Sequence, residues 1–247
     1  MQTDPQEKAM ESKTAVVTGL IASIVLIAAN VQAGSIDSVE RASRNNDLTA
    51  LETQRSAIVD ADTPYLAALA DYRIGIAHSV RGDETEAGIA LTAASEQLDV
   101  LVKAEPKNAE AWALLANVYG MRMGLSPFSA MKLAGQADRA RAKARALAPA
   151  NPRVLLTEGI SLYNTPGMWG GSKPKALAVL DQAIAAFEAT PDSGWGFAEA
   201  LVWRGLAHAE TGDTAAAERD FKRAVELEPA YAWAQSLLAR QRAVASN

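Results

Sequence analysis

The chain has 247 residues, of which 49% are hydrophobic, 21% charged and only 6% aromatic. Alanine, the best helix former, occupies 52 positions, so the composition predicts an all-α protein. The formal charge of −5 excludes a nucleic-acid binder, which needs a basic surface, and the absence of cysteine excludes disulfides, thiolate metal sites and thiol catalysis.

The first feature in chain order is an uncharged stretch from Thr14 to Ile36, whose residues 15–29 are almost entirely apolar. Val31 and Ala33 place small residues at the −3 and −1 positions of a signal-peptidase site before Gly34. This pattern predicts an export signal, with a mature protein that begins at Gly34 in the periplasm or beyond the cell.

Two interpretations of this segment stay open. Residues 1–33 are a cleaved signal peptide, or residues 15–33 are an uncleaved membrane anchor with the rest of the chain facing the periplasm, because about 20 apolar residues can span a bilayer. Either Met1 or Met10 can be the start.

Two later segments, residues 75–87 and 205–217, align without gaps. Each contains a glycine and a histidine, followed by a Gly-Asp pair that predicts the end of one helix and the start of the next. Glycine supplies the left-handed residue after the first helix, and aspartate accepts hydrogen bonds from the free N–H groups of the second. The chain therefore contains a repeated helix pair.

These residues resemble the tetratricopeptide repeat (TPR), a 34-residue helix pair. Residues 198–231 carry its pattern at Leu201, Gly205, His208, Gly212, Ala217, Phe221, Ala224 and Pro229. In the first repeat the closing Pro106 comes seven residues late, which predicts a second helix longer by two turns. The second and third repeats have about nine and about five extra residues between their helices. Residues 151–187 also resemble a variant repeat of exported bacterial helical-repeat proteins.

The resemblance implies an all-α, right-handed solenoid of about four helix pairs with capping helices at both ends. The expected repeats are 62–106, 109–149, 152–191 and 195–229 within residues 62–231, with a helical cap over 34–61 and a final capping helix over 232–247.

Three features could carry chemistry. His78 and His208 occupy the same position of two repeats, so we expect both rings to fill space between helices. The sequence Gly-Met-Trp-Gly-Gly-Ser-Lys over residues 167–173 has the wrong order for a phosphate loop. It predicts a shaped turn in which Ser172 caps a helix and Trp169 folds back; alternatively, a protruding loop touches a partner through Trp169.

The third feature is a basic helix over residues 131–147, which is expected to bury alanines and leucines and to expose its charges to solvent. Docking on an acidic partner or on anionic lipid headgroups is its alternative role. Neither a metal site nor a cofactor site is expected.

In TPR proteins the first helix of each repeat lines a concave groove. The groove positions that the resemblance assigns to partner binding are Tyr72, Ile76, Asn117, Leu156, Ile160, Tyr163, Asn164 and Leu206. The chaperone-binding branch of the family clamps a carboxylate with a cluster of lysine, arginine and asparagine, of which this chain retains only Asn117. An apolar groove with asparagine and tyrosine suits an extended or helical peptide. Long insertions or the N-terminal helix could cover some of these positions.

The sequence thus predicts a non-catalytic, periplasmic scaffold for a peptide or partner protein. The alternative is an enzyme or small-ligand-binding protein on the same stack. We expect an open groove for a scaffold and a buried charged pair in a pocket for an enzyme.

Overall fold

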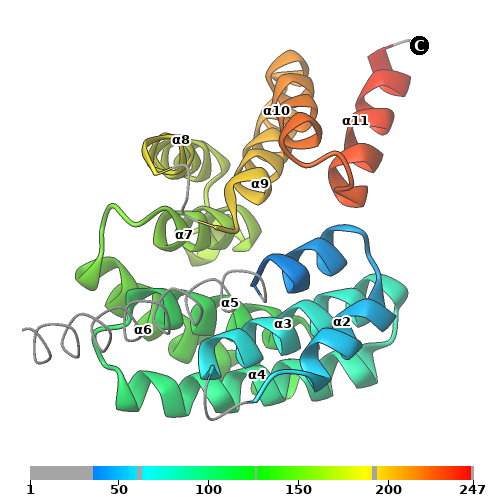
Figure 1. Ribbon diagram of the computed structural model, residues 1–247. Helices are drawn as coiled ribbons and strands as arrows, with labels where there is room; N and C mark the ends of the chain where they lie inside the picture. The colour runs from blue at the N-terminus through cyan, green and yellow to red at the C-terminus, as the bar shows by residue number, and fades with distance from the viewer. Residues whose placement is uncertain (1–35, 60–62, 126, 191–193, 246–247) are drawn as a thin grey trace, which may run out of the picture.

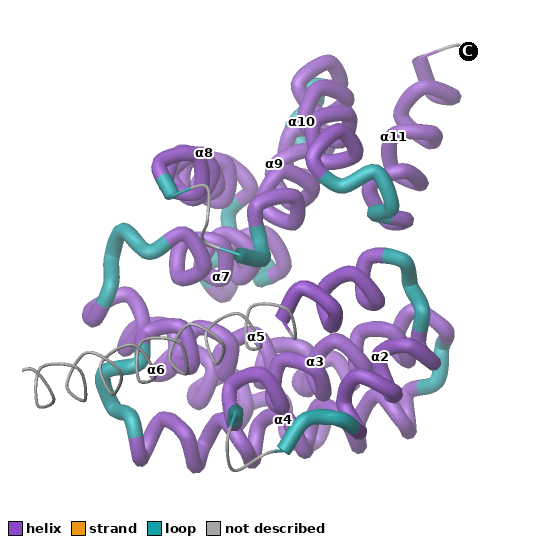
Figure 2. The backbone as a smooth tube through the Cα atoms, viewed as in Figure 1, coloured by secondary structure: helices purple, strands orange, loops and turns teal. Residues whose placement is uncertain are grey.

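The computed structural model describes residues 36–245 except 60–62, 126 and 191–193, so the expected export signal lies outside the described residues. Within them all regular secondary structure is helical, which confirms the all-α prediction (Figures 1 and 2). After a helix over residues 36–44 come α2 (Leu48–Ser56), α3 (Pro64–Arg81), α4 (Glu84–Ala104), α5 (Ala109–Leu125), α6 (Ala130–Leu147), α7 (Pro152–Asn164), α8 (Lys173–Ala189), α9 (Phe197–Glu210), α10 (Thr214–Leu227) and α11 (Ala232–Ala245).

Four antiparallel pairs make up the stack: α3 with α4, α5 with α6, α7 with α8, and α9 with α10. Each pair also packs against the next, α2 packs on α3, and α11 packs on α10. The chain is therefore a helical-repeat solenoid with a capping helix at each end. Two short 3-10 turns, η1 (Pro127–Ser129) and η2 (Gly167–Trp169), lie inside the second and third pairs.

The turns of the first and fourth pairs form as the Gly-Asp pattern predicts. Gly82 and Gly212 have positive φ angles of 78° and 91°. The carboxylate of Asp83 accepts from the Glu86 N–H at 3.3 Å, and that of Asp213 accepts from the Ala216 N–H at 2.9 Å. These contacts satisfy N–H groups that have no partner within the helix.

In three of the helix pairs the two helices touch at a glycine of the first helix. A Cβ atom would lie 2.6 Å from Leu91 at Gly75, 2.6 Å from Leu180 at Gly159, and 2.5 Å from Phe221 at Gly205. Only glycine permits this approach.

The predicted extension of the first pair is also present, because α4 has 21 residues whereas α10 has 14. Asn108, Asn151 and Ser172 cap α5, α7 and α8 with their side chains. Thr63 precedes Pro64 but makes no side-chain cap. In the part of the chain that the structure describes, no helix combines the length and the apolarity needed to cross a membrane.

Candidate functional site

The helix over residues 36–44 lies between α3 and the C-terminal helices (Figure 1). Val39 and Ala42, three residues apart on one face, are buried against α2 and α3. The neighbouring Glu40 is 3% exposed. This helix therefore brings a charged side chain into the space that the repeats enclose.

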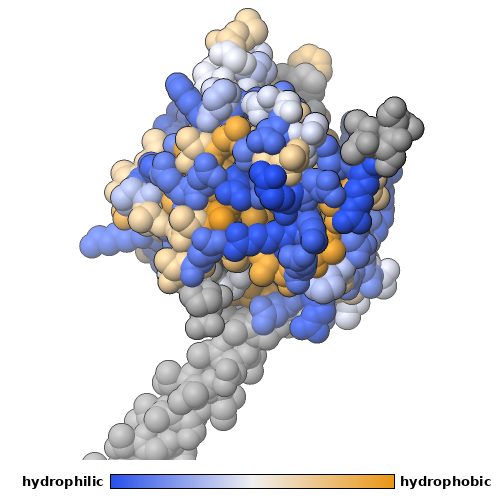
Figure 3. Space-filling model, turned by 90° about the horizontal axis from the view of Figure 1, so that it is seen from above, coloured by the Kyte–Doolittle hydropathy of each residue, from blue (hydrophilic) through white to orange (hydrophobic). Residues whose placement is uncertain are grey.

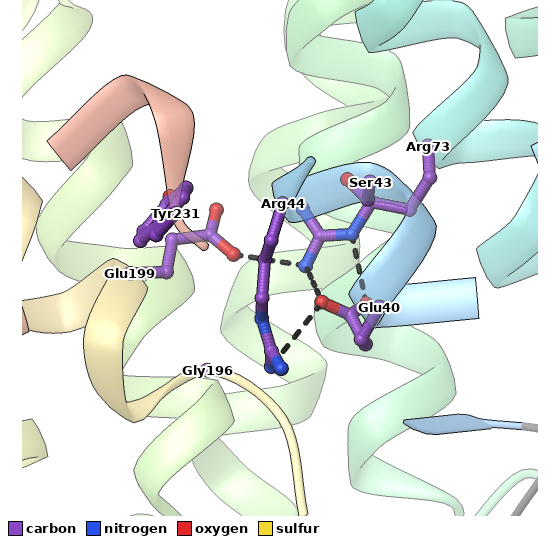
Figure 4. A pocket seen from close by; sticks show the side chains of 7 residues that line it. All are labelled: Glu40, Ser43, Arg44, Arg73, Gly196, Glu199 and Tyr231. Carbon is purple, nitrogen blue, oxygen red and sulfur yellow. Dashed lines mark hydrogen bonds and ion pairs between the residues drawn. The ribbon is translucent and has the colours of Figure 1, made fainter. Parts of the chain in front are cut away.

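Arg73 of α3 links the two ends of the stack (Figure 4). Its Nε donates to Glu40 at 2.8 Å, and its Nη2 donates to Glu40 at 3.1 Å and to Glu199 of α9 at 2.9 Å. Arg44 adds an ion pair with Glu228, at the end of α10. The first and last repeats are thus joined directly by the largely buried Arg73–Glu199 pair, and the N-terminal helix is joined to the last repeat by the partly exposed Arg44–Glu228 pair.

Trp195, in the connection before α9, extends this network. Its ring lies between two guanidinium groups, with the Cζ of Arg73 at 5.1 Å and that of Arg153 at 5.3 Å from the ring centroid. Arg153 also pairs with Glu110 at 3.3 Å. We call Glu40, Arg73, Glu110, Arg153, Trp195 and Glu199 the central cluster; all four repeats contribute to it.

Burial changes the acidity of groups beside the central cluster. Desolvation raises the pKa of Tyr72 and Tyr231 well above the usual value, because burial disfavours the charged phenolate. Desolvation also raises the pKa of Glu228, and the nearby Arg44 opposes this shift. Around the ion pairs, burial thus favours the neutral form of each of these three groups.

A small recess opens beside these ion pairs, lined by Glu40, Ser43, Arg44, Arg73, Gly196, Glu199 and Tyr231 (Figure 4). The expected mark of an enzyme, a buried charged pair in a pocket, is therefore present. However, Arg73 is already engaged by two carboxylates, and neither histidine lines the recess. Among the described residues, no three side chains of metal-binding type lie together. The Arg73–Glu40–Glu199 ion pairs therefore suit a structural role, holding the two ends of the stack together, better than acid–base catalysis.

The structure separates the predicted groove residues into two groups. Tyr72 and Leu156 are 5% and 1% exposed and belong to the core, so neither can contact a partner in this conformation. Tyr72 lies next to Arg73, which the N-terminal helix covers through Glu40. The others are partly or fully exposed: Ile76, Asn117, Ile160, Tyr163, Asn164 and Leu206.

Three aromatic rings connect the first helices of the third and fourth repeats with the capping helix α11. Tyr163 of α7 meets Trp203 of α9 edge-on at 5.3 Å between centroids, and Trp203 meets Trp233 of α11 at 5.3 Å. Trp233 is 37% exposed, and the other two are partly exposed. We call these three residues the aromatic strip. Seen from above the view of Figure 1, the surface shows apolar residues scattered among hydrophilic ones (Figure 3).

Polar contacts fix the first ring of the strip. The Tyr163 hydroxyl donates to Glu210, while Lys173 Nζ lies 3.5 Å from the Tyr163 ring centroid and 3.1 Å from Glu210. The tyrosine hydrogen bond is the main cause that lowers the pKa of Glu210, and Lys173 lowers it further. Tyr163 is thus held in place without being buried.

Trp169 does not fold back on its repeat as the turn interpretation predicted, because its side chain is 73% exposed. The turn itself forms: Gly170 has φ of 94°, and a Cβ at Gly171 would lie 1.6 Å from the Thr165 carbonyl oxygen. The protruding-loop interpretation fits this exposure.

The histidines lie near the ends of α3 and α9 and are partly buried, and His78 Nδ1 is 3.3 Å from Asp83. Arg73 and Glu199 join the first and fourth repeats, to which the two histidines belong. The basic helix α6 buries Leu133, Ala137, Ala140 and Ala144, as predicted.

Sequence reasoning did not predict the central cluster or two members of the aromatic strip, Trp203 and Trp233. Glu40 and Glu199 are 33 and 126 positions from Arg73 in the sequence, so no short-range pattern predicts that they contact it. The one available signal was the repeat register, which places Glu110, Arg153 and Glu199 on the groove side of the first helices of their repeats.

The sequence matches no protein-family profile and no curated protein. Among solved structures, the fold is similar to that of TTC0263, a thermophilic TPR protein of Thermus thermophilus, with a TM-score of 0.51 and 20% identity over 79% of this chain and 88% of that one. It is also similar, with a TM-score of 0.46 and 20% identity over 72% and 70% of the two chains, to PilW, a type IV pilus biogenesis factor. The likeness to TTC0263 and the four helix pairs show the TPR-like fold that the repeats predicted.

Proposed function

We propose that this chain is a non-catalytic scaffold that binds a peptide or partner protein along the first helices of its later repeats. The observation that carries the proposal is the aromatic strip. Tyr163 and Trp203 come from the first helices of the third and fourth repeats, and Trp233 comes from the capping helix α11. The three rings lie in edge-to-face contact and remain partly exposed. Tyrosine and tryptophan are among the side chains that most often dominate binding energy at interfaces.

Neighbouring residues complete a surface suited to a peptide. Ile160 and Leu206 add partly exposed apolar area, and the exposed Asn164 can bond a backbone amide. Tyr163 is oriented by Glu210 and Lys173, which lowers the entropy that binding would cost.

We place this scaffold in the periplasm or cell envelope. The support is the uncharged, apolar stretch with small residues before Gly34, which precedes the helical repeats.

Binding of a small ligand in the recess beside Arg73 is the second candidate. The buried Arg73–Glu40–Glu199 group favours it, because a ligand with its own charge could exchange with one of these partners. We rank it below the scaffold because the ion pairs already satisfy one another.

Capture from the native envelope tests the proposal. The full chain carries an affinity tag and is cross-linked in its host before purification. The double variant Tyr163→Ala, Asn164→Ala should lose the captured proteins, since one anchor residue can contribute about 2 kcal/mol, or roughly thirtyfold in affinity. The matched control is Ile89→Ala, which removes a 59% exposed apolar side chain from α4.

Circular dichroism must show the same helical content in all three proteins. Equal capture by the wild type and the double variant contradicts the proposal. Loss of capture with Trp169→Ala alone would assign binding to the α7–α8 turn instead.

A further inference from the structure

Two turns of the stack carry large apolar side chains that contribute nothing to the core. Phe128 and Met131, at the α5–α6 turn, are fully exposed and 90% exposed, respectively. Met168 and Trp169, at the α7–α8 turn, are 84% and 73% exposed. Single exposed apolar residues are ordinary on a protein surface. Here, however, the turns of two adjacent helix pairs each expose two large apolar side chains.

These are the two turns that the sequence lengthens. The turns of the first and fourth repeats close tightly at Gly82 and Gly212, and beside them only the single apolar side chain of Val80 is strongly exposed among the described residues. Consecutive repeats stack in the same orientation, and α5 and α7 are in contact. The α5–α6 and α7–α8 turns therefore lie along one edge of the solenoid, which we call the turn edge.

The charge pattern of the turn edge differs from that of the whole chain. The chain has 29 acidic residues, yet none lies in residues 111–137 or in residues 159–180, the two stretches that contain these turns. Lys132 and Lys175 are exposed there, and neither has an ion-pair partner among the described residues. The short turn after α3, by contrast, carries Asp83, Glu84 and Glu86.

We propose that the turn edge docks on the surface of an anionic lipid bilayer. Phe128, Met131, Met168 and Trp169 would enter the interfacial region, and Lys132 and Lys175 would meet headgroup phosphates. Aromatic and apolar side chains combined with lysine are the composition that binds at the membrane interface. The two stretches that form these turns contain no acidic residue, and the nearby Glu210 is ion-paired with Lys173, so repulsion from the negative lipid surface is small.

A bilayer fits these observations better than a protein does. The four side chains project from turns and lie outside every buried core cluster of the described chain, whereas protein hot spots favour desolvated pockets. The apolar residues 15–29 precede the helix over 36–44 by only a few positions. As a signal or as an anchor, that segment brings the chain to a membrane.

Because the chain has no cysteine, one introduced cysteine gives a unique labelling site. Phe128→Cys and Met168→Cys place an environment-sensitive nitrobenzoxadiazole label on the turn edge of the full chain. Val100→Cys, at a 66% exposed apolar position of α4, is the matched control. Each protein is reconstituted with vesicles of phosphatidylcholine mixed with phosphatidylglycerol, and aqueous iodide quenching is measured.

Labels at positions 128 and 168 should emit at shorter wavelength and lose iodide quenching with these vesicles, whereas the label at 100 stays accessible. Lys132→Glu with Lys175→Glu should restore quenching, since each lysine near an anionic surface contributes about fivefold to binding. Unchanged emission at both positions overturns the inference. Shielding by a lipid-free envelope protein fraction, without shielding by vesicles, assigns the edge to a protein and also overturns it. Neither outcome bears on capture at the aromatic strip.

Discussion

Arg73 of α3 and Glu199 of α9 form an ion pair of 2.9 Å although 126 residues separate them in the chain. Glu40, on the helix over residues 36–44, binds the same guanidinium at 2.8 Å. A helical-repeat stack normally has contacts only between neighbouring repeats. This pair adds a contact between the first repeat and the last, so it constrains the curvature of the whole solenoid.

Loss of this contact should weaken the fold strongly. Arg73→Met leaves Glu199 without its counter-charge and leaves Glu40 with only the more distant Arg44, at 3.7 Å. Breaking a buried pair costs about 3–5 kcal/mol in the free energy of unfolding. Lys222→Met, which removes one partner of the exposed Lys222–Glu226 pair, should change it by no more than about 0.5 kcal/mol. Urea unfolding measures both. Equal urea midpoints for the two variants would show that the ion pairs of Arg73 contribute no stability.

The close helix contact at Gly205 makes a second prediction. Gly205→Ala places a Cβ against Phe221 and should destabilise the chain by about 1–3 kcal/mol, and Gly205→Leu by more. Gly88→Ala meets nothing within 4 Å in α4 and should stabilise by about 0.5–1 kcal/mol through helix propensity. Thermal unfolding compares them; a Gly205→Ala protein as stable as the wild type would contradict the repeat packing.

Glu210 gives a prediction about pH. Its pKa lies below the usual 4.5, chiefly because Tyr163 donates a hydrogen bond to it. A lowered folded-state pKa contributes stability that is present above about pH 4.5 and is lost as the pH falls through the folded-state value. NMR titration of the Glu210 carboxyl should therefore show a low pKa that rises in Tyr163→Phe. The same pKa in both proteins would mean that this hydrogen bond is absent in solution.

The N-terminal segment, outside the described residues, makes a prediction about processing. The mature protein should begin at Gly34, and Ala33→Pro should leave the precursor uncut in the membrane. N-terminal sequencing and fractionation of the native host check this. Recovery of the full-length wild-type chain from the cytosol would refute export.

The local parts of the fold could be predicted from the sequence because their causes are local. Gly82 and Asp83 terminate and start helices within a few residues, and the late Pro106 reports the length of α4. The central cluster could not be predicted in this way. Its members meet only because the stack curves until α3 faces α9, and that curvature is a sum over all repeats.

The same reason explains the mixed result for the groove. Tyr72 lies where the N-terminal helix packs on α3, and Leu156 lies in the main core. These two positions, which the family resemblance assigned to the groove, are therefore buried in this chain. Tyr163 and Asn164, at the far end of α7, stay partly or fully exposed. Trp169 needed the structure as well, because a glycine-rich turn can fold either way.

The most direct test of the scaffold function is site-specific photo-cross-linking in the native envelope. A photoreactive amino acid replaces Asn164, which is exposed beside the aromatic strip, or Ile89, which is exposed on α4. We expect a discrete cross-linked partner from position 164 and none from position 89. Absence of any adduct at 164, or the same adducts from both positions, would contradict binding along the first helices of the later repeats.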